Sequence, residues 1–309
     1  MATAMTMDRS CLDLQNYGPQ TNTGQAMSLA DAEEYCRKLA NSHYENFTVA
    51  SNLLPKNLHQ HFCNVYAYCR WADDLADEVT DPDESCRLLD WWNQQLHQCY
   101  SGRADHAVFI ALRKTVQTFN IPSTPFADLI TAFRRDQTQT RYADAADLLS
   151  YCESSANPVG RIVLHLIDCH SAENQRLSDS VCTGLQLANF CQDVARDYVR
   201  GRIYLPRESC ERFGYFEEDF AAKRYNKAFR DLMRFEVARA ETYLKAGKAL
   251  GRKVPRSVRV PIYLFMYGGF AVLQEIRRNK YNLWRQRPTI GKWKKTRLLI
   301  QAWWRAMVL

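Results

Sequence analysis

Residues 66–78 read Y-A-Y-C-R-W-A-D-D-L-A-D-E, an apolar and aromatic stretch that ends in four acids. In a helix over 57–79, the apolar residues recur every three or four positions and form a packing face. A neighbouring track on the same helix carries Tyr66, Arg70, Asp73 with Asp74, and Asp77. Large aromatic side chains take the remaining directions, so little of this helix is polar enough to face water. We therefore expect the acids to point into a site.

A second polar track lies in residues 185–197, L-Q-L-A-N-F-C-Q-D-V-A-R-D. Its members are Gln186, Asn189, Asp193 and Asp197. In a helix they form one straight line about 16 Å long, surrounded by apolar side chains. Because buried carboxylates need cationic or metal partners, this pattern predicts a helix that lines a cavity.

The ligand chemistry of these two tracks favours magnesium. Mg²⁺ takes one or two carboxylates, keeps waters and completes its shell with phosphate oxygens. Zinc is disfavoured because no His/Cys cluster has ligand spacing, and a di-iron bundle would need Glu-x-x-His pairs, which are absent from the sequence. A single pair of acids on a helix is more often solvated surface. Two pairs on two apolar helices favour metal ions around a diphosphate.

The composition predicts an all-α domain. The 309 residues are 46% hydrophobic, with only 12 glycines and 10 prolines, which disfavours a sheet with many turns. No Gly/Ser-rich linker divides the body, so we expect a single domain. The expected helices span 28–42, 57–79, 84–100, 106–119, 125–136, 145–171, 178–200, 222–250, 257–283 and 291–307.

The two ends of the chain differ from its body. Residues 1–27 are polar and lack the apolar core of a signal peptide, so we expect a disordered tail. After Glu275 there is no acid, while ten Lys or Arg follow. This uneven charge does not resemble a nucleic-acid binder. The eleven cysteines are scattered along the chain, so we expect them to be reduced and buried, as in a cytoplasmic protein. No apolar run reaches the length of a membrane span.

Five motifs in order resemble the squalene and phytoene synthase family, which joins isoprenyl diphosphates head to head. H-Y-E-N-F at 43–47 is similar to a short motif near the diphosphate, and 66–77 looks like the first aspartate motif. Y-C-E-S-S-A-N-P-V-G at 151–160 resembles a kinked helix of small residues. Residues 186–197 look like the second aspartate motif. R-G-R-I-Y-L-P at 200–206 resembles the segment that follows this motif in the family.

The resemblance implies an all-α isoprenoid-synthase fold, with helices around a central cavity, over a catalytic domain at 28–290. It implies Mg²⁺ ligands at Asp73, Asp77, Asn189, Asp193 and Asp197. Catalytic roles would fall to the four aspartates with Tyr66, Arg70 and Tyr151. Substrate contacts would fall to His43, Tyr44, Phe47, Ala156, Gly160, Gln186, Asn189 and Tyr281.

Within the family, S-H-Y-E-N-F, S-A-N-P-V-G-R and A-N-F-C-Q-D look most like the hydroxysqualene synthases of bacterial hopanoid pathways. These convert presqualene diphosphate and water into hydroxysqualene, without NADPH. Gln192 stands where squalene and phytoene synthases usually carry arginine. The loss of a cation there suits an enzyme that ionises only presqualene diphosphate. The alternatives are a squalene, presqualene diphosphate, dehydrosqualene or phytoene synthase, and a non-catalytic scaffold of the same fold.

The last segment, 291–309, mixes Trp and Leu with Lys and Arg. A basic amphipathic helix of this kind can lie on an anionic membrane, whereas moderate amphipathicity is also what any packed surface helix shows. We expect a cytoplasmic enzyme with peripheral contact at the inner face of the membrane. Pathway enzymes that pass on intermediates are the other expected partners.

Overall fold

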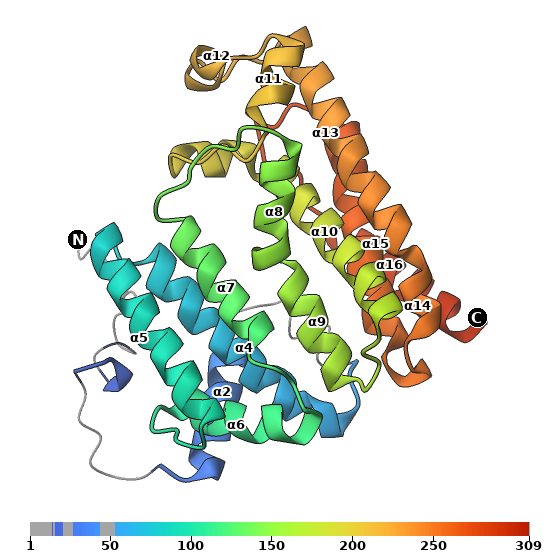
Figure 1. Cartoon of the computed structure of the whole chain (residues 1–309). Helices are drawn as coiled ribbons and strands as arrows, with labels where there is room; N and C mark the ends of the chain where they lie inside the picture. Colours follow the sequence, from blue (N-terminus) through green and yellow to red (C-terminus); the bar gives the residue numbers. More distant parts are fainter. Residues whose placement is uncertain (1–13, 15, 21–26, 44–52, 309) are drawn as a thin grey trace, which may run out of the picture. The chain divides into compact units, whose positions relative to one another are not determined.

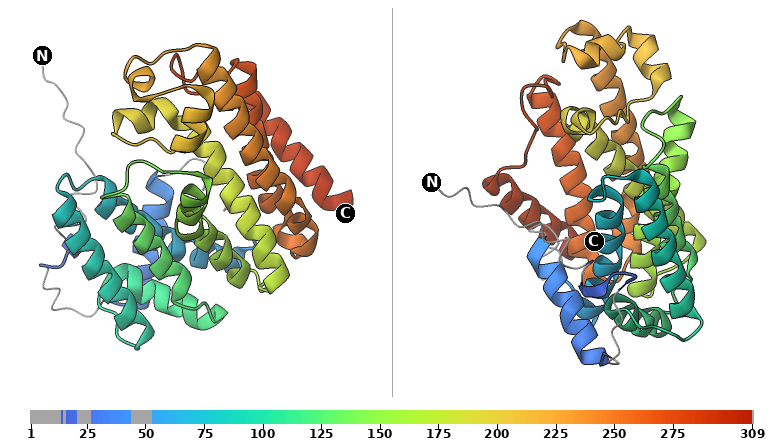
Figure 2. Two further views of the ribbon diagram at one scale, coloured as in Figure 1. Left: turned by 45° about the horizontal axis from the view of Figure 1, so that its top comes forward. Right: turned by 90° about the vertical axis from the view of Figure 1, so that its left-hand side faces the viewer.

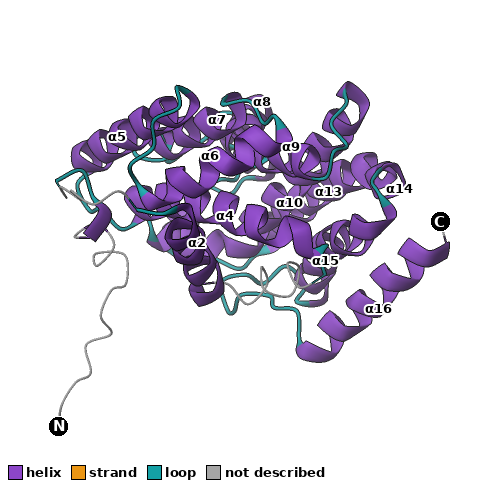
Figure 3. Cartoon of the chain, turned by 90° about the horizontal axis from the view of Figure 1, so that it is seen from below, coloured by secondary structure: helices purple, strands orange, loops and turns teal. Residues whose placement is uncertain are grey.

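The computed structural model describes residues 14, 16–20, 27–43 and 53–308. Within these ranges the secondary structure is helical, with one isolated bridge between Arg141 and Ile203 and no strand (Figure 3). The all-α prediction is confirmed. Contacts divide the chain into two compact units, one formed by Met1–Thr48 and His59–Thr138, the other by Val49–Leu58 and Gln139–Leu309.

In the described residues, the first unit contains all or most of five helices (Figure 1). They are α2 (Leu29–His43), α4 (Lys56–Asp77), α5 (Pro82–Tyr100), α6 (Ala107–Phe119) and α7 (Thr124–Arg135). Side-chain caps mark the starts of two of these helices, α2 and α5. The Ser28 hydroxyl accepts from the Asp31 amide at 3.2 Å, and Asp81 caps α5 with Pro82 in its first turn, where a missing N–H costs nothing.

Helix α4 is tied to its neighbours by buried polar groups. The Asn64 amide donates to the Ala111 carbonyl at 3.1 Å and to Thr115 at 3.0 Å, and the Tyr68 hydroxyl donates to the Phe126 carbonyl at 2.9 Å. Tyr68 is fully buried. Each bond satisfies a group that would otherwise be costly in the core, so the register of α4 against α6 and α7 is fixed.

The second unit carries the remaining helices. These are α8 (Ala145–Ser155), α9 (Asn157–Leu166), α10 (Ala172–Val199), α11 (Arg207–Phe213), α12 (Glu217–Ala221), α13 (Lys227–Ala246), α14 (Leu250–Lys253), α15 (Arg259–Arg278) and α16 (Lys292–Val308), with short 3₁₀ turns η1 (Gly247–Ala249) and η2 (Arg256–Val258). Helix α10 packs along α13 and contacts α9 and α15, and α15 contacts α16 (Figure 2).

Several helix boundaries differ from expectation; the helices expected to end at 250 and 283 end at Ala246 and Arg278. The segment expected as one helix over 145–171 breaks at Ala156 and ends at Leu166. Helix α10 starts six residues before 178, because Ser171 caps it by accepting from the Asn174 amide. The first turns of α10 are mostly polar, so no apolar period marks them as helical in the sequence. Helix α13 starts at Lys227 rather than 222, behind an Asn226 cap.

The short helices α11 and α12 were missed, since seven and five residues are too few for a period to show. Left-handed Gly214, with φ of 66°, ends α11, a conformation that glycine adopts readily. None of the helices in the described ranges is long and apolar enough to cross a membrane.

Most of the tail at 1–27 lies outside the described residues, and its disorder stays a prediction. At Tyr17, which is described, the ring packs against Tyr35, with centroids 4.8 Å apart, and lies 5.9 Å from the His106 ring. The catalytic-domain boundaries at 28 and 290 also stay predictions.

Candidate active site

The first aspartate motif occupies the last turns of α4 in the first unit. Arg70 lies one turn before the acids and pairs with three of them. Its guanidinium donates to Asp73 Oδ2 at 3.3 Å and to Glu78 Oε1 at 3.3 Å, and it also pairs with Asp74. Helical spacing of three, four and eight residues brings these groups together. The track read from the sequence is therefore a charge cluster with one arginine at its centre.

Asp74 is the most enclosed acid of this cluster. Its side chain is 16% exposed, compared with 44% for Asp73. Burial raises the pKa of Asp74 to about 7, while Arg70 lowers it and Glu78 raises it. Asp73 and Asp77 are the more accessible pair, with Asp77 exposed. Asp73 and Asp77 are therefore the acids of this cluster that an ion could reach most easily, although Asp73 also accepts from Arg70.

The Arg70 side chain keeps one donor for a ligand. Its Nε is buried and has no hydrogen-bond partner among the described residues. A buried guanidinium N–H without an acceptor is costly. It suits an incoming anionic oxygen, which an arginine would bind through a charge-assisted hydrogen bond. Tyr66, one turn earlier, is partly buried on the same helix.

The second aspartate motif lies on α10 in the second unit, and its central acid is paired with an arginine. Asp193 is 8% exposed. Arg287, from the segment between α15 and α16, donates Nη2–H to Asp193 Oδ2 at 2.9 Å and Nε–H to Oδ1. Arg196 Nη1 lies 3.8 Å from the same carboxylate. The buried negative charge is thus compensated within the unit, as burial requires.

Gln192 joins this pair to the same segment. Its amide nitrogen donates to the Pro288 carbonyl at 2.5 Å, and its amide oxygen accepts from Arg287 Nη2 at 3.1 Å. The sequence-based argument that Gln192 leaves the motif without a cation is therefore wrong, because Arg287 supplies one at the same place. No spacing signal marks Arg287, since it lies 94 residues away from Asp193.

Asp197 is the acid of α10 without a compensating partner. The described part of the chain shows no ion pair or hydrogen bond to its side chain. Burial raises the pKa of Asp197 to about 7, and Asp193 raises it further, whereas the neighbouring arginines lower it. The carboxylate borders a small hollow of about 10 Å³, with Arg202, Tyr204 and Phe190 in its wall. This volume holds about one water molecule.

An aromatic cluster, Tyr142, Tyr151, Phe190 and Tyr204, lies beside this hollow. The rings of Phe190 and Tyr204 stack at 4.0 Å and 9°, and Tyr151 lies 5.8 Å from Tyr204. Tyr151 is 4% exposed. The sequence found Tyr151 only through the family resemblance and missed Tyr142 and Tyr204, because aromatic residues in apolar segments usually belong to the core.

The kink expected from residues 151–160 is present. Helix α8 ends at Ser155, Ala156 has φ of −110° and ψ of −45°, and α9 begins at Asn157. Pro158 cannot donate a helical hydrogen bond, which keeps the two helices separate. A Cβ on Gly160 would lie 2.3 Å from Ser178 Oγ and 2.6 Å from Cys182 Sγ of α10. Gly160 thus permits close packing of α9 on α10, and its contact with substrate stays a prediction.

The other sequence-predicted residues are only partly placed. Tyr44 and Phe47 lie outside the described residues, and His43 is the last residue of α2. Gln186 is partly buried on α10 and Asn189 is exposed there. Tyr281 lies in the turn after α15, under the Arg234 guanidinium at 5.6 Å. Its φ of 63° is left-handed, and its role toward a substrate stays a prediction.

The oxygen donors of both motifs fit Mg²⁺. In the described part of the chain, no three His, Cys, Asp or Glu side chains form a ready metal cluster. Mg²⁺ does not require one, because it binds one or two carboxylates and fills its shell with water and phosphate oxygens. Asp197, partly buried and without a side-chain partner among the described residues, and the accessible Asp73 and Asp77 are donors of the right kind.

Comparisons with known proteins agree on the class of protein that this fold and these motifs define, an all-α isoprenoid synthase. A family model described as squalene/phytoene synthase matches residues 40–294. A 15-cis-phytoene synthase from Synechocystis is 30% identical over 97% of this chain and 93% of its own length.

Two solved structures share the fold, and the match covers nearly the whole length of each. The squalene synthase HpnC from Alicyclobacillus acidocaldarius is 42% identical, with a TM-score of 0.79 over 82% of this chain and 96% of that one. A dehydrosqualene synthase in complex with a ligand is 25% identical, with a TM-score of 0.83 over 91% of this chain and 98% of that one. The chain belongs to the squalene/phytoene synthase family. It is an enzyme of the prenyltransferase type, from a family that condenses prenyl diphosphates head to head and uses divalent metal to ionise the diphosphate.

Proposed function

We propose that the chain is a Mg²⁺-dependent hydroxysqualene synthase that converts presqualene diphosphate and water into hydroxysqualene and diphosphate. One observation carries this choice within the family. Gln192 precedes Asp193 where squalene and phytoene synthases usually carry arginine, and its amide instead holds Arg287 and Pro288, so the cation beside Asp193 comes from a different part of the chain. The higher identity to HpnC than to the phytoene synthases supports a branch apart from them.

The proposed reaction begins with the break of the carbon–oxygen bond to the diphosphate. The diphosphate leaves with the bonding electrons, and a cyclopropylcarbinyl cation remains. A water oxygen then forms the new bond to the rearranged cation, and its proton passes to solvent. Bound Mg²⁺ would neutralise the charge that develops on the leaving group.

The chain's own groups would bind the leaving group and protect the cation. We propose that Arg70 holds a diphosphate oxygen through Nε, its donor without a partner. Arginine aimed at developing negative charge lowers the barrier. The ring faces of Tyr151 and Phe190 would stabilise the cation through their quadrupoles. The roles of Tyr66, Gln186 and Asn189 near the diphosphate are part of the same proposal.

Products distinguish this reaction from its alternatives. Purified enzyme with Mg²⁺ and presqualene diphosphate should form the triterpene alcohol without NADPH. A squalene synthase is the second candidate, favoured by the similarity to the squalene synthase HpnC and by the cation that Arg287 supplies. It would need NADPH and yield squalene. Formation of dehydrosqualene or phytoene from farnesyl or geranylgeranyl diphosphate alone would support the remaining alternatives.

A non-catalytic scaffold is the alternative from another class. It predicts that Asp73→Asn and Asp193→Asn leave the biological function unharmed, whereas the enzyme proposal predicts its loss. Cytoplasmic location, exchange of intermediates with pathway enzymes and contact with the inner face of a membrane also remain proposals. The long apolar chains of substrate and product favour work beside a membrane.

A further inference from the structure

Helix α16 turns an apolar stripe toward solvent. Trp293, Ile300, Trp304 and Met307 are spaced by seven, four and three residues and therefore share one face. Their exposed fractions are 91%, 62%, 58% and 69%. Large apolar side chains gathered on one exposed face mark an interaction surface more than scattered ones do.

The orientation of the helix follows from its contacts with α15. Ala302, on the opposite face, is fully buried. Lys294 Nζ donates to Gln274 Oε1 at 3.0 Å and to Glu275 Oε1 at 2.5 Å. An amphipathic helix that docks for stability alone would place its tryptophans inward. Here the small residue packs and the tryptophans face out.

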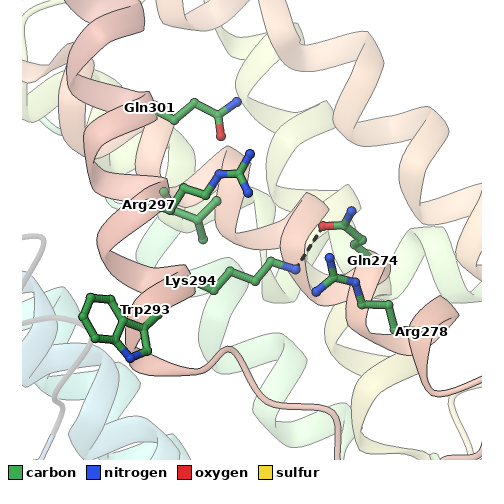
Figure 4. Close-up of a pocket in the computed structure, with 7 residues that line it drawn as sticks. Gln274, Arg278, Trp293, Lys294, Arg297 and Gln301 are labelled. Carbon is green, nitrogen blue, oxygen red and sulfur yellow. Dashed lines mark hydrogen bonds between the residues drawn. The ribbon is translucent and has the colours of Figure 1, made fainter.

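A cationic groove lies between α15 and α16 at the start of the stripe (Figure 4). Its volume is about 380 Å³, and its wall carries Arg278, Lys294, Arg297, Gln274, Gln301, Leu298 and Trp293. Glu275 pairs with both Arg278 and Lys294. Arg297 has no ion pair in the described part of the chain. Three cations against one acid leave the groove positive.

The positive charge of α16 and of the residues that lead to it indicates which kind of partner the stripe would bind. Helix α16 has five Lys or Arg, and no acid follows Glu275 in the sequence. Two copies of such a helix would repel each other, which disfavours self-association. An anionic bilayer instead attracts the cations, at about 1 kcal/mol for each near its surface, and tryptophan settles at the level of the headgroups.

We propose that α16 docks the enzyme on an anionic lipid bilayer. The stripe enters the boundary between headgroups and acyl chains, and the cations of the groove bind lipid phosphates. A helix of 17 residues lies flat in this arrangement, as interfacial helices do. The proposal names the part of the protein surface that would contact the membrane. It does not depend on which product the enzyme forms.

The test is vesicle co-sedimentation of the full chain. Wild type should pellet with vesicles of phosphatidylglycerol and phosphatidylcholine, less with phosphatidylcholine alone, and less as salt rises. Trp293→Ser with Trp304→Ser should weaken binding at least tenfold, since two large apolar groups are lost. Arg297→Glu should weaken binding to the anionic vesicles roughly thirtyfold, because it changes the charge by two.

Matched controls separate the surface from general effects. Phe216→Ser removes an aromatic side chain that is 51% exposed just before α12, and Lys248→Glu makes the same charge change in η1. Both should bind like wild type. All variants should keep the wild-type melting temperature and turnover of detergent-dispersed substrate, so loss of vesicle binding would not reflect loss of the active site.

Three results would overturn the proposal. The stripe variant could bind vesicles as tightly as wild type, or wild type could bind neutral and anionic vesicles equally. Alternatively, sedimentation velocity could show that wild type dimerises without lipid and that the stripe variant is a monomer. That last result would assign the stripe to a second copy of the chain.

Discussion

Arg287 and Asp193 form a two-pronged ion pair between the segment before α16 and the second aspartate motif. The Asp193 side chain is 11% exposed and that of Arg287 is 36% exposed. The carboxylate proposed to bind Mg²⁺ is thus already compensated by a cation of the chain. Metal binding at Asp193 would have to compete with Arg287 or share the carboxylate with it.

Removal of this arginine should change both stability and metal response. Arg287→Ala leaves Asp193 buried without its partner and should lower the free energy of unfolding by about 2 kcal/mol, less than for a fully buried pair because Arg287 is partly solvated. The freed carboxylate should bind Mg²⁺ more tightly. Urea unfolding with and without Mg²⁺ measures both effects. The exposed Arg285→Ala is the control and should change neither, and a stabilised Arg287→Ala protein would contradict the pairing.

Magnesium with pyrophosphate should raise the melting temperature of wild type. At a hundredfold excess over the dissociation constant, the rise should be about 5 °C by mass action on the folded state. Asp73→Asn and Asp193→Asn should each abolish most of this shift. Glu153→Gln, an exposed change on α8, should keep it. A full shift in both aspartate variants, measured by scanning fluorimetry, would refute the proposed ligands.

Two glycines in helices should respond to alanine with opposite signs. Gly160→Ala places a methyl group 2.3 Å from Ser178 Oγ and should destabilise the protein by about 1–3 kcal/mol through overpacking. Adding Ser178→Ala should restore part of the loss. Gly268→Ala meets nothing within 4 Å on α15 and should stabilise by about 0.5–1 kcal/mol. Equal effects at the two sites in chemical denaturation would contradict the packing of α9 on α10.

Acid should destabilise the first unit through His106. The ring meets Trp71 and Trp92 edge to face, with centroids 4.8 and 5.0 Å away, and its Nδ1 accepts from the Val108 amide. Burial lowers the pKa of His106 to about 3. The unfolded chain binds this proton near pH 6.5. Stability is therefore complete above pH 6.5 and falls as the pH drops toward 3, by about 2 kcal/mol at pH 5.

The variant His106→Asn should reduce that pH dependence. Asparagine keeps a helix-capping acceptor and cannot titrate, so the loss of stability between pH 7 and pH 5 should be about 2 kcal/mol smaller than in wild type. His97→Asn, on the exposed side of α5, should retain the wild-type slope. Denaturant titrations at both pH values provide the comparison, and identical slopes in His106→Asn and wild type would disprove the role of His106.

The fold was predictable because its signals are local. Apolar periods predicted most helices, including the one expected over 28–42, which the structure shows at Leu29–His43 behind the Ser28 cap. The boundaries that failed are those where a cap precedes a polar turn, as at Ser171, or where the helix is too short for a period, as at Arg207–Phe213.

The sequence groups candidate site residues only where they share one helix. Asp193 and Asp197 follow from four-residue spacing. Arg287 depends on a tertiary approach of a segment that lies far along the chain, and its sequence neighbours show no pattern. The same limit explains why Gln192 was read as the loss of a cation, when its amide instead binds the segment that brings one.

The most direct test of the proposed function uses water labelled with heavy oxygen. Purified enzyme is incubated with Mg²⁺ and presqualene diphosphate in labelled water, without NADPH, and the product is identified by mass spectrometry. The account predicts hydroxysqualene that carries the label in its hydroxyl group, and no product from Asp193→Asn. Squalene, dehydrosqualene, an unlabelled alcohol or no turnover by wild type would contradict it.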